Sequence, residues 1–237
     1  MRDFSGKSVM VLGGSRGIGA AIVRHFASAG ARVIFTYAGS ADAAATLASA
    51  TGATATKADS ASRDEVVGAV AAAGALDILV INAGVAMMGD PTELDPDAVD
   101  RLIDINVRAP YHAAVEAGRT MNDNGRIIII GSVNGDRAGW PGLTAYALSK
   151  SAMQGLARGL ARDFGHRGIT ANTVQPGPVD TDMNPAEGPL ASAMHAAMAI
   201  KRHAHADEIA DLVLFLAGPK AAMITGTTHT IDGGFGA

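Results

Sequence analysis

The stretch Ser8–Gly19, SVMVLGGSRGIG, decides the fold of this chain. Its first five residues form a mainly apolar run typical of a strand buried inside a parallel sheet, and residues 20–29 then carry apolar side chains at helical spacing. Glycines between a strand and a helix allow a tight turn, and free N–H groups at the start of the helix can bind a pyrophosphate. The stretch therefore predicts the opening unit of a dinucleotide-binding fold.

The same two patterns alternate along the rest of the 237 residues. Further strands are predicted at residues 31–36, 53–57, 76–81, 126–130, 169–175 and 227–231. Further helices are predicted at residues 42–50, 62–73, 97–121, 143–165 and 207–216. The weakly patterned stretch 183–205 predicts a mobile substrate loop.

No repeat or linker interrupts this order, so we expect one domain over residues 1–237. The predicted fold class is α/β. Strands that alternate with helices indicate a Rossmann-type, doubly wound, mostly parallel sheet of seven strands with helices on both faces.

Composition and charge exclude several classes of function. The formal net charge of −4 and the isoelectric point near 5.9 disfavour a nucleic-acid surface. The absence of cysteine excludes disulfides and thiolate metal ligands. His203 and His205 lack a third ligand at a recognisable spacing, so we predict no metal site. The apolar run near the N-terminus is too short for a signal peptide or a membrane span, and we expect a cytoplasmic protein without a membrane partner.

A hydroxyl, a phenol and an ammonium follow the strand predicted at 126–130, on Ser132, Tyr146 and Lys150. In a helix, Tyr146 and Lys150 stand at i and i+4 and share one face. A fixed positive charge lowers the pKa of a nearby phenol from about 10, so Tyr146 becomes a candidate general acid or base. Tyr-x-x-x-Lys also occurs on ordinary amphipathic helices. Ser132 favours the chemical interpretation because it ends a buried strand, where ligands bind in open α/β sheets.

The segment after the second strand predicts which nucleotide binds. An acid near this point normally accepts hydrogen bonds from the adenosine ribose, but the chain has Tyr37-Ala38-Gly39-Ser40 there. With no carboxylate to repel a 2′-phosphate, and with Arg16 in the glycine loop, NADP(H) is favoured over NAD(H). Asp59-Ser60 and Asn82-Ala83-Gly84 suit the adenine edge and a flat ligand, although turn formation explains both equally well.

Together the motifs resemble the short-chain dehydrogenase/reductase family across essentially the whole chain. The resemblance rests on the glycine loop, Asn82-Ala83-Gly84, Asn106, Ser132, Tyr146-x-x-x-Lys150 and Pro176-Gly177. It implies hydride transfer between a nicotinamide and a small carbonyl or alcohol substrate.

The resemblance also implies a role for each of four candidate catalytic residues. Tyr146 would exchange the proton of the substrate oxygen, and Ser132 would hold that oxygen. Lys150 would bind the nicotinamide ribose and lower the Tyr146 pKa, while Asn106 would support a water-linked proton path. The expected cofactor-binding residues are Gly13, Ser15, Arg16, Gly17, Ile18, Gly19, Tyr37, Ala38, Gly39, Ser40, Asp59, Ser60, Asn82, Ala83, Gly84, Tyr146, Lys150, Pro176, Gly177, Val179 and Thr181.

Three positions depart from the family pattern. Leu12 replaces a threonine that usually precedes the glycine loop, and Ile81 replaces the first Asn of the usual Asn-Asn-Ala-Gly. We expect neither change to abolish cofactor binding. Ser132 also lies one residue further from Tyr146 than is common, so we expect the extra residue either to bulge from the loop or to reshape the pocket around Trp140.

A second hypothesis is a regulatory protein that binds a cyclic dinucleotide. Gly131–Arg137 and His229–Gly233 resemble a bacterial branch of the family associated with cyclic-di-GMP binding and biofilm dispersal. Arg101–Asp104 and the pair Arg158 and Arg162 superficially resemble dinucleotide-binding patterns. Inside predicted helices, solvated or salt-bridged faces explain both patterns more simply.

Small side chains predict that the chain assembles. Seven of them lie in the helices predicted at 97–121 and 143–165, where they would let helices of two subunits approach closely: Ala113, Ala114, Ala117, Gly118, Ala152, Gly155 and Gly159. We expect a symmetric homodimer or homotetramer, as is common in the family.

Overall fold

Seven parallel strands form one sheet, in the order β3-β2-β1-β4-β5-β6-β7, within the residues that the structure describes, 3–237. In this computed structural model the strands are β1 (Ser8–Leu12), β2 (Arg32–Tyr37), β3 (Thr54–Lys57), β4 (Ile78–Ile81), β5 (Arg126–Ile130), β6 (Thr170–Pro176) and β7 (Thr228–Ile231). β1 pairs with β2 on one side and with β4 on the other, so the strand order reverses there. Ligands of open α/β sheets bind outside the carboxyl ends of the strands at such a reversal.

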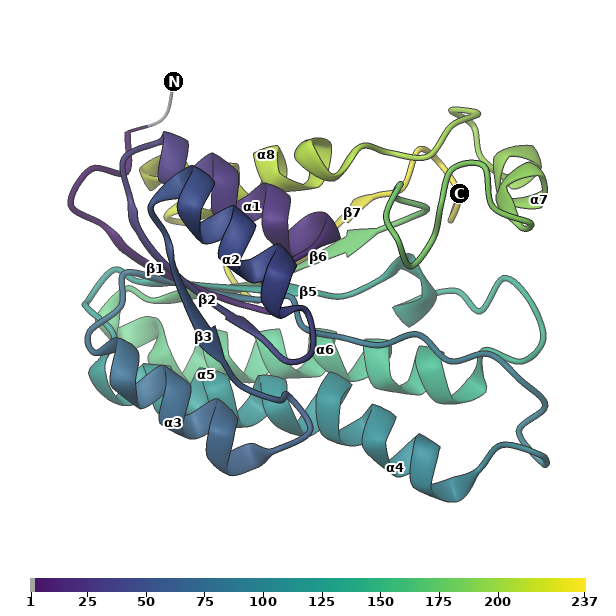
Figure 1. Cartoon of the computed structure of the whole chain (residues 1–237), viewed down its shortest axis with the longest axis horizontal. Coiled ribbons are helices and arrows are strands. Elements are labelled where there is room, and N and C mark those ends of the chain that lie inside the picture. The colour runs from purple at the N-terminus through teal and green to yellow at the C-terminus, as the bar shows by residue number, and fades with distance from the viewer. Residues whose placement is uncertain (1–2) are drawn as a thin grey trace.

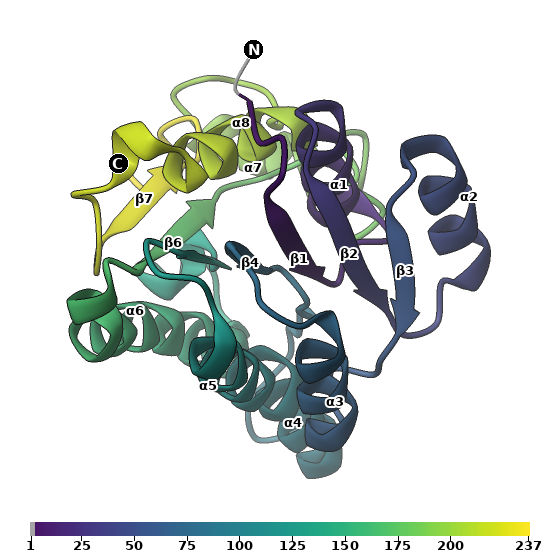
Figure 2. The same ribbon diagram turned by 90° about the vertical axis from the view of Figure 1, so that its left-hand side faces the viewer.

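Helices cover both faces of the sheet, as Figure 1 and Figure 2 show. They are α1 (Gly17–Ser28), α2 (Ala41–Thr51), α3 (Arg63–Ala73), α4 (Pro96–Ile103), α5 (Ala109–Thr120), α6 (Thr144–Phe164), α7 (Ala191–Ala197) and α8 (Ala206–Ala217). Val9 and Val11 of β1 pack with α1 and α8, whereas Met10 and Leu12 pack with α3, α5 and α6. Successive side chains of a strand point to opposite faces, so one apolar strand serves two cores. The predicted doubly wound fold is confirmed, and all six strand pairs are parallel.

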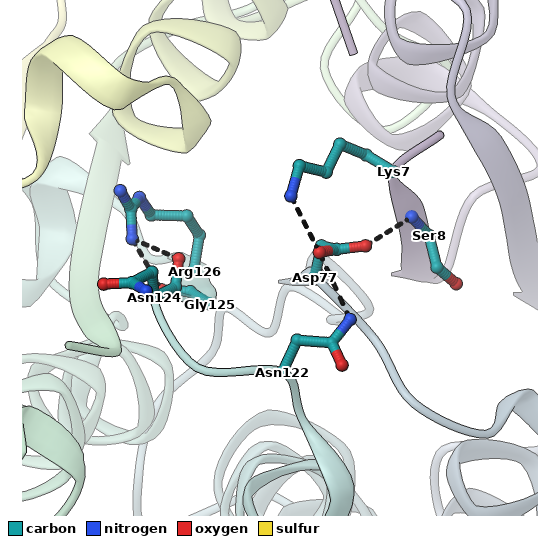
Figure 3. Close-up of polar contacts among 7 residues, drawn as sticks. All are labelled: Lys7, Ser8, Asp77, Asn122, Asn124, Gly125 and Arg126. Atoms are coloured by element: carbon teal, nitrogen blue, oxygen red, sulfur yellow. Dashed lines mark hydrogen bonds and ion pairs between the residues drawn. The ribbon is translucent and has the colours of Figure 1, made fainter. Parts of the chain in front are cut away.

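A polar cluster ties the amino edge of the sheet together, opposite the edge where ligands bind (Figure 3). The Asp77 carboxylate accepts hydrogen bonds from Lys7 Nζ at 2.9 Å, from Ser8 N at 2.8 Å and from Asn122 Nδ2 at 3.2 Å. Burial acts to raise the pKa of Asp77, but these hydrogen bonds outweigh it and leave the pKa below its usual value. Nearby, the buried Arg126 side chain donates to two backbone carbonyls of the turn before β5.

The single helix predicted at 97–121 is interrupted, so this prediction was wrong. A π-helical turn, Asp104–Arg108, separates α4 from α5, and Ala109 N donates to a carbonyl five residues earlier instead of four. Pro110 supplies a physical reason, because it has no N–H to offer the carbonyl of Asn106 four residues earlier. π-helical turns inside α-helices are frequent at functional sites, and this one carries the site candidate Asn106.

Residues 183–205 form a cap beside the carboxyl ends of the strands, at the right of Figure 1. The cap contains α7, a helix too short for its apolar spacing to be recognised in the sequence. A parallel bridge between Val179 and Ala204 joins the end of the cap to the segment after β6. The mobility of this stretch stays a prediction.

The small residues expected at a subunit interface divide into two groups. Ala113, Ala114, Ala117 and Gly118 are buried in the core of the chain itself, so they cannot contact a second subunit. A Cβ on Gly118 would lie 2.3 Å from Phe164 Cζ, which shows how closely α5 and the end of α6 pack. This part of the reasoning was wrong; Gly155 and Gly159 are exposed on α6 and remain available, and the homodimer or homotetramer stays a prediction.

We expect Gly118→Ala to lower the free energy of unfolding by about 1–3 kcal/mol, because the added methyl group overpacks the Phe164 ring. Gly68→Ala is the matched control, since Gly68 is exposed in the middle of α3 and its Cβ would meet no atom within 4 Å. It should raise the free energy of unfolding by about 0.5–1 kcal/mol, the helix-propensity difference between glycine and alanine. Urea denaturation measures both, and a stabilised Gly118→Ala variant would contradict the packing argument.

Candidate active site

One cavity of about 730 Å³ runs along the carboxyl ends of the central strands. Every predicted site residue lines it except Gly19 and Asn106. In the sheet, β2 and β3 lie on one side of β1, whereas β5 and β6 lie on the other side. The cavity therefore extends in both directions from β1 and has two ends. Residues 37–40 line the nucleotide end, and Ser132 and Tyr146 line the catalytic end.

Hydrogen bonds fix the glycine loop at the nucleotide end. Gly13 N donates to Thr36 Oγ1 at 2.9 Å, and Asn82 Nδ2 donates to the Gly13 carbonyl at 2.7 Å. A Cβ on Gly19 would lie 2.1 Å from that carbonyl oxygen, so only glycine fits there. Gly19 therefore serves the packing of the loop. Thr36 was not predicted as a site residue, although a hydroxyl at the end of an apolar strand was an available signal.

Arg16 lies at the N-terminus of α1 and lines the cavity, as predicted. Its Nη1 lies 3.4 Å from Oδ2 of Asp182, in the segment after β6. Both side chains are largely exposed, so the ion pair contributes little stability. A bound 2′-phosphate would compete with Asp182 for Arg16. Residues 37–40 supply no carboxylate at this end.

The acidic residue after β3 is held by its own neighbours. The carboxylate of Asp59 accepts from Ala61 N at 2.9 Å and pairs with Arg101 at 3.1 Å. The hydrogen bond from Ala61 is the main cause that lowers the pKa of Asp59. Asp104 pairs with Arg108 at 2.6 Å, so the charges of the Arg101–Asp104 pattern are already paired, as the simpler interpretation predicted. Arg101 also lines the cavity, which its helical spacing did not indicate.

Ser132 follows β5 and is held at two points. Its Oγ accepts from Asn134 N at 3.2 Å, and its carbonyl accepts from Gln175 Nε2 at 2.8 Å. Burial raises the pKa of Tyr146 above its ordinary value, and a hydrogen bond with the Ser132 side chain acts in the opposite direction but less strongly. The net direction is therefore opposite to the one expected from Lys150 alone, because burial dominates and spacing along a helix does not report burial. The effect of Lys150 on this pKa stays a prediction.

The Lys150 side chain is buried beneath the catalytic end of the cavity. Its Nζ lies 5.8 Å from the Tyr146 ring centroid and donates to the Ile130 carbonyl at 3.3 Å, which leaves further donors for a ligand. Burial lowers the pKa of the Lys150 amine to about 8. A Cβ on Gly84 would lie 3.1 Å from this Nζ, so the glycine leaves the space that the amine occupies.

Asn106 does not line the cavity; its side chain clamps the loop after β4. Oδ1 accepts from Val85 N at 2.9 Å, and Nδ2 donates to the Val85 carbonyl at 2.9 Å and to Ser149 Oγ at 3.0 Å. Ser149 in turn donates to the Tyr146 carbonyl at 2.8 Å. The buried amide therefore has its partners within the protein, and a water-linked proton path at Asn106 stays a prediction.

Apolar side chains form the wall at the catalytic end. The rings of Trp140 and Phe235 pack with centroids 5.3 Å apart and planes tilted by 45°. They join Val133, Met194 and Met198 in a small apolar cluster. Trp140, in the loop with the extra residue, belongs to the pocket wall. Whether the extra residue bulges from the loop or reshapes the pocket stays a prediction. Phe235 and Met194 were not predicted, because neither lies in a stretch with a regular pattern.

Metal ligation finds no support in the residues that the structure describes. Within residues 3–237, no group of three or more His, Cys, Asp or Glu side chains is placed to hold a metal ion. His203 contacts His195 instead, with 2.7 Å between its Nδ1 and the partner ring's Nε2. Over the same residues, no helix combines the length and the apolar character needed to cross a membrane.

Comparisons with known proteins identify the family of the chain. A family model described as enoyl-(acyl carrier protein) reductase matches residues 13–236. The cyclic-di-GMP-binding biofilm dispersal mediator protein of Escherichia coli K12 is 62% identical over 237 residues, 100% of both chains. A crystal structure of BdcA in complex with NADPH has a TM-score of 0.97 at 63% identity and covers 99% of this chain and 96% of that chain. A short chain dehydrogenase from Burkholderia cenocepacia J2315 in complex with NADP has a TM-score of 0.96 at 45% identity, with 100% of both chains covered.

The chain therefore belongs to the short-chain dehydrogenase/reductase family, as its motifs predicted. Fold and family are those of nicotinamide-dependent oxidoreductases, and the two solved relatives contain the phosphorylated nucleotide. The 62% identical relative is named for a different ligand, cyclic-di-GMP.

Proposed function

We propose that the chain is an NADP(H)-dependent oxidoreductase that transfers hydride between the nicotinamide and a small carbonyl or alcohol substrate, with Tyr146 as general acid/base. The observation that carries this proposal is the meeting of Ser132, Tyr146 and Lys150 at one end of a single cavity. The other end of the cavity holds the glycine loop, and residues 37–40 place no carboxylate there.

The solved relatives that hold NADPH and NADP bear out the cofactor predicted from the sequence. The residues of this chain fit such a nucleotide. The start of α1 offers free backbone N–H groups to a pyrophosphate, and Gly39 has no atom within 4 Å of its Cβ position, which leaves room near the ribose. When bound, the nucleotide supplies or accepts the hydride at its nicotinamide ring.

Ser132 and Tyr146 are placed to bind the substrate oxygen together. Ser132 Oγ accepts the Asn134 N–H, and its own hydroxyl proton can be donated to the substrate oxygen in place of Tyr146. The raised pKa keeps the Tyr146 phenol protonated near neutrality, which is the form that gives up a proton. In reduction, Tyr146 transfers this proton to the carbonyl oxygen while the carbonyl carbon receives hydride. The positive charge of Lys150 stabilises the phenolate that remains.

The first prediction concerns nucleotide preference. NADPH should bind more tightly than NADH by about 1–3 kcal/mol, the size of a hydrogen bond to a charged group, and Arg16→Ala should remove most of this difference. Asp182→Asn should strengthen NADPH binding, because it removes the carboxylate that competes for Arg16. Titration calorimetry measures these affinities. Equal affinities of the wild-type chain for the two nucleotides would mean that Arg16 does not contact the 2′-phosphate.

A second prediction follows from the Lys150 amine, whose pKa of about 8 means that it is charged at pH 7 and mostly neutral at pH 9. If the ammonium holds the ribose, binding must take up a proton at high pH, and NADPH affinity should fall about tenfold between pH 7 and pH 9. Lys150→Met should bind NADPH weakly but with little change over this range. The same pH dependence in both proteins would assign the effect to another group.

The proposed acid itself can be removed with little change in shape. Tyr146→Phe should lower kcat by about 10²- to 10⁴-fold on any carbonyl that the wild-type chain reduces, the usual value of general acid catalysis. NADPH affinity should change by less than about threefold, because Lys150 still holds the ribose. Steady-state kinetics and calorimetry measure the two effects. Wild-type turnover in Tyr146→Phe would disprove the assignment of the acid.

A second candidate function is the binding of cyclic-di-GMP, which the name of the 62% identical relative favours. Arg16 and Arg101 line the nucleotide end of the cavity, and both are engaged by carboxylates that a phosphate could replace. Cyclic-di-GMP bound in this cavity would therefore exclude NADPH. Calorimetry of cyclic-di-GMP binding, with and without saturating NADPH, tests this competition. Cyclic-di-GMP binding that NADPH does not affect would require a site elsewhere.

A further inference from the structure

The charged side chains that line the cavity are gathered away from its catalytic end. Arg16 and Asp182 pair beside the glycine loop, and Arg101 pairs with Asp59 after β3. Lys150 is the exception, and it is buried beneath Tyr146 with its role already assigned. Among the described residues that line the catalytic end, no cation is therefore left to receive a carboxylate or a phosphate of the substrate.

The mouth of the cavity is apolar as well. Four large apolar side chains that line it are at least a third exposed to solvent: Val85, Met88, Met183 and Leu190. Exposed apolar side chains that gather at one place mark an interaction site. Methionine also adapts to irregular shapes, because its side chain is unbranched and flexible. A molecule that enters this mouth meets apolar surface before it meets the catalytic groups.

Aromatic side chains form the inner wall. The ring centroids of Trp140 and Phe235 lie 5.3 Å apart, within the usual range of aromatic pairs, and both residues line the cavity. Val133 and Met198 pack behind them, so the wall has a buried apolar support. A third aromatic ring could extend this cluster with little loss of conformational freedom.

We propose that the substrate of this site is an uncharged carbonyl compound with an apolar, aromatic body that packs against Trp140 and Phe235. This inference rests on the proposed oxidoreductase function and names its substrate class. A substrate with a carboxylate or phosphate near the carbonyl would be desolvated in the cavity without an ionic partner, which is strongly unfavourable. The carbonyl oxygen of the substrate makes its polar contacts with Ser132 and Tyr146.

Acetophenone and 4-acetylbenzoate test the proposal, because they differ by one carboxylate. With NADPH, kcat/KM should be at least about tenfold higher for acetophenone. Equal values, or a preference for 4-acetylbenzoate, overturn the inference. Calorimetry of both ketones with the chain saturated with NADP⁺ measures the same preference without turnover. Tighter binding of acetophenone without any reduction would overturn the proposed oxidoreductase function but support the apolar site. If neither ketone bound, the inference about the substrate class would be overturned too.

Single substitutions test whether the preference for acetophenone arises from the wall formed by Trp140 and Phe235. Trp140→Ala should lower kcat/KM for acetophenone by about tenfold and for propanal by less than about threefold, since a small aldehyde does not reach the wall. Leu190→Lys should raise kcat/KM for 4-acetylbenzoate by about threefold, because it adds a cation at the mouth. Met223→Ala is the control, because Met223 is 94% exposed and lies outside the cavity. An equal loss for acetophenone and propanal in Trp140→Ala would assign Trp140 a structural role only and overturn the proposed contact.

Discussion

The close approach of two backbones, at the ends of β1 and β4, is the constraint on which the site depends. Asn82 N and Ala83 N both donate to the Leu12 carbonyl, at 3.1 and 2.8 Å. A Cβ on Gly13 would lie 2.7 Å from Ala83 Cα, so the approach is possible only without a side chain there. Because the glycine loop and the loop after β4 are fixed to each other, these two lining segments of the cavity keep one relative position.

The catalytic side chains are positioned mainly by backbone contacts rather than by charges. Ser132 Oγ accepts from a main-chain N–H, Lys150 Nζ donates to a carbonyl of β5, and the Ser149 hydroxyl donates to the main-chain carbonyl of Tyr146. Burial shifts the pKa values of Lys150 and Tyr146 toward the neutral forms, and the Ser132 hydrogen bond opposes this shift only partly at Tyr146. Lys150 therefore loses its charge more readily than an exposed lysine, and Tyr146 keeps its proton.

The sequence predicts features that depend on residue type and local spacing, and it misses features that depend on packing. The strand Ser8–Leu12 follows from its apolar run. The Tyr146 candidate follows from the chemical type of its side chain and from its fixed spacing to Lys150. The contact of Trp140 with Phe235 joins distant parts of the chain, so no local pattern reports it. The π-helical turn was hidden because the apolar residues around it keep helical spacing; Pro110 was its only local signal. The direction of the Tyr146 pKa shift required burial, which spacing does not contain.

The polar cluster at the amino edge divides the molecule into parts of different local stability. Asp77 makes two hydrogen bonds to Ser8 of β1: its N–H donates to the Ser8 carbonyl, and its carboxylate accepts from Ser8 N. The Asp77 carbonyl also accepts from Arg126 N at the start of β5. Three adjacent strands are thus held at one edge, while the cap over the opposite edge is joined to the sheet by few bonds. We expect fluctuations that open the cap to leave the sheet paired. Amide hydrogens near Asp77 should then exchange mainly through global unfolding, and those of the cap through local opening.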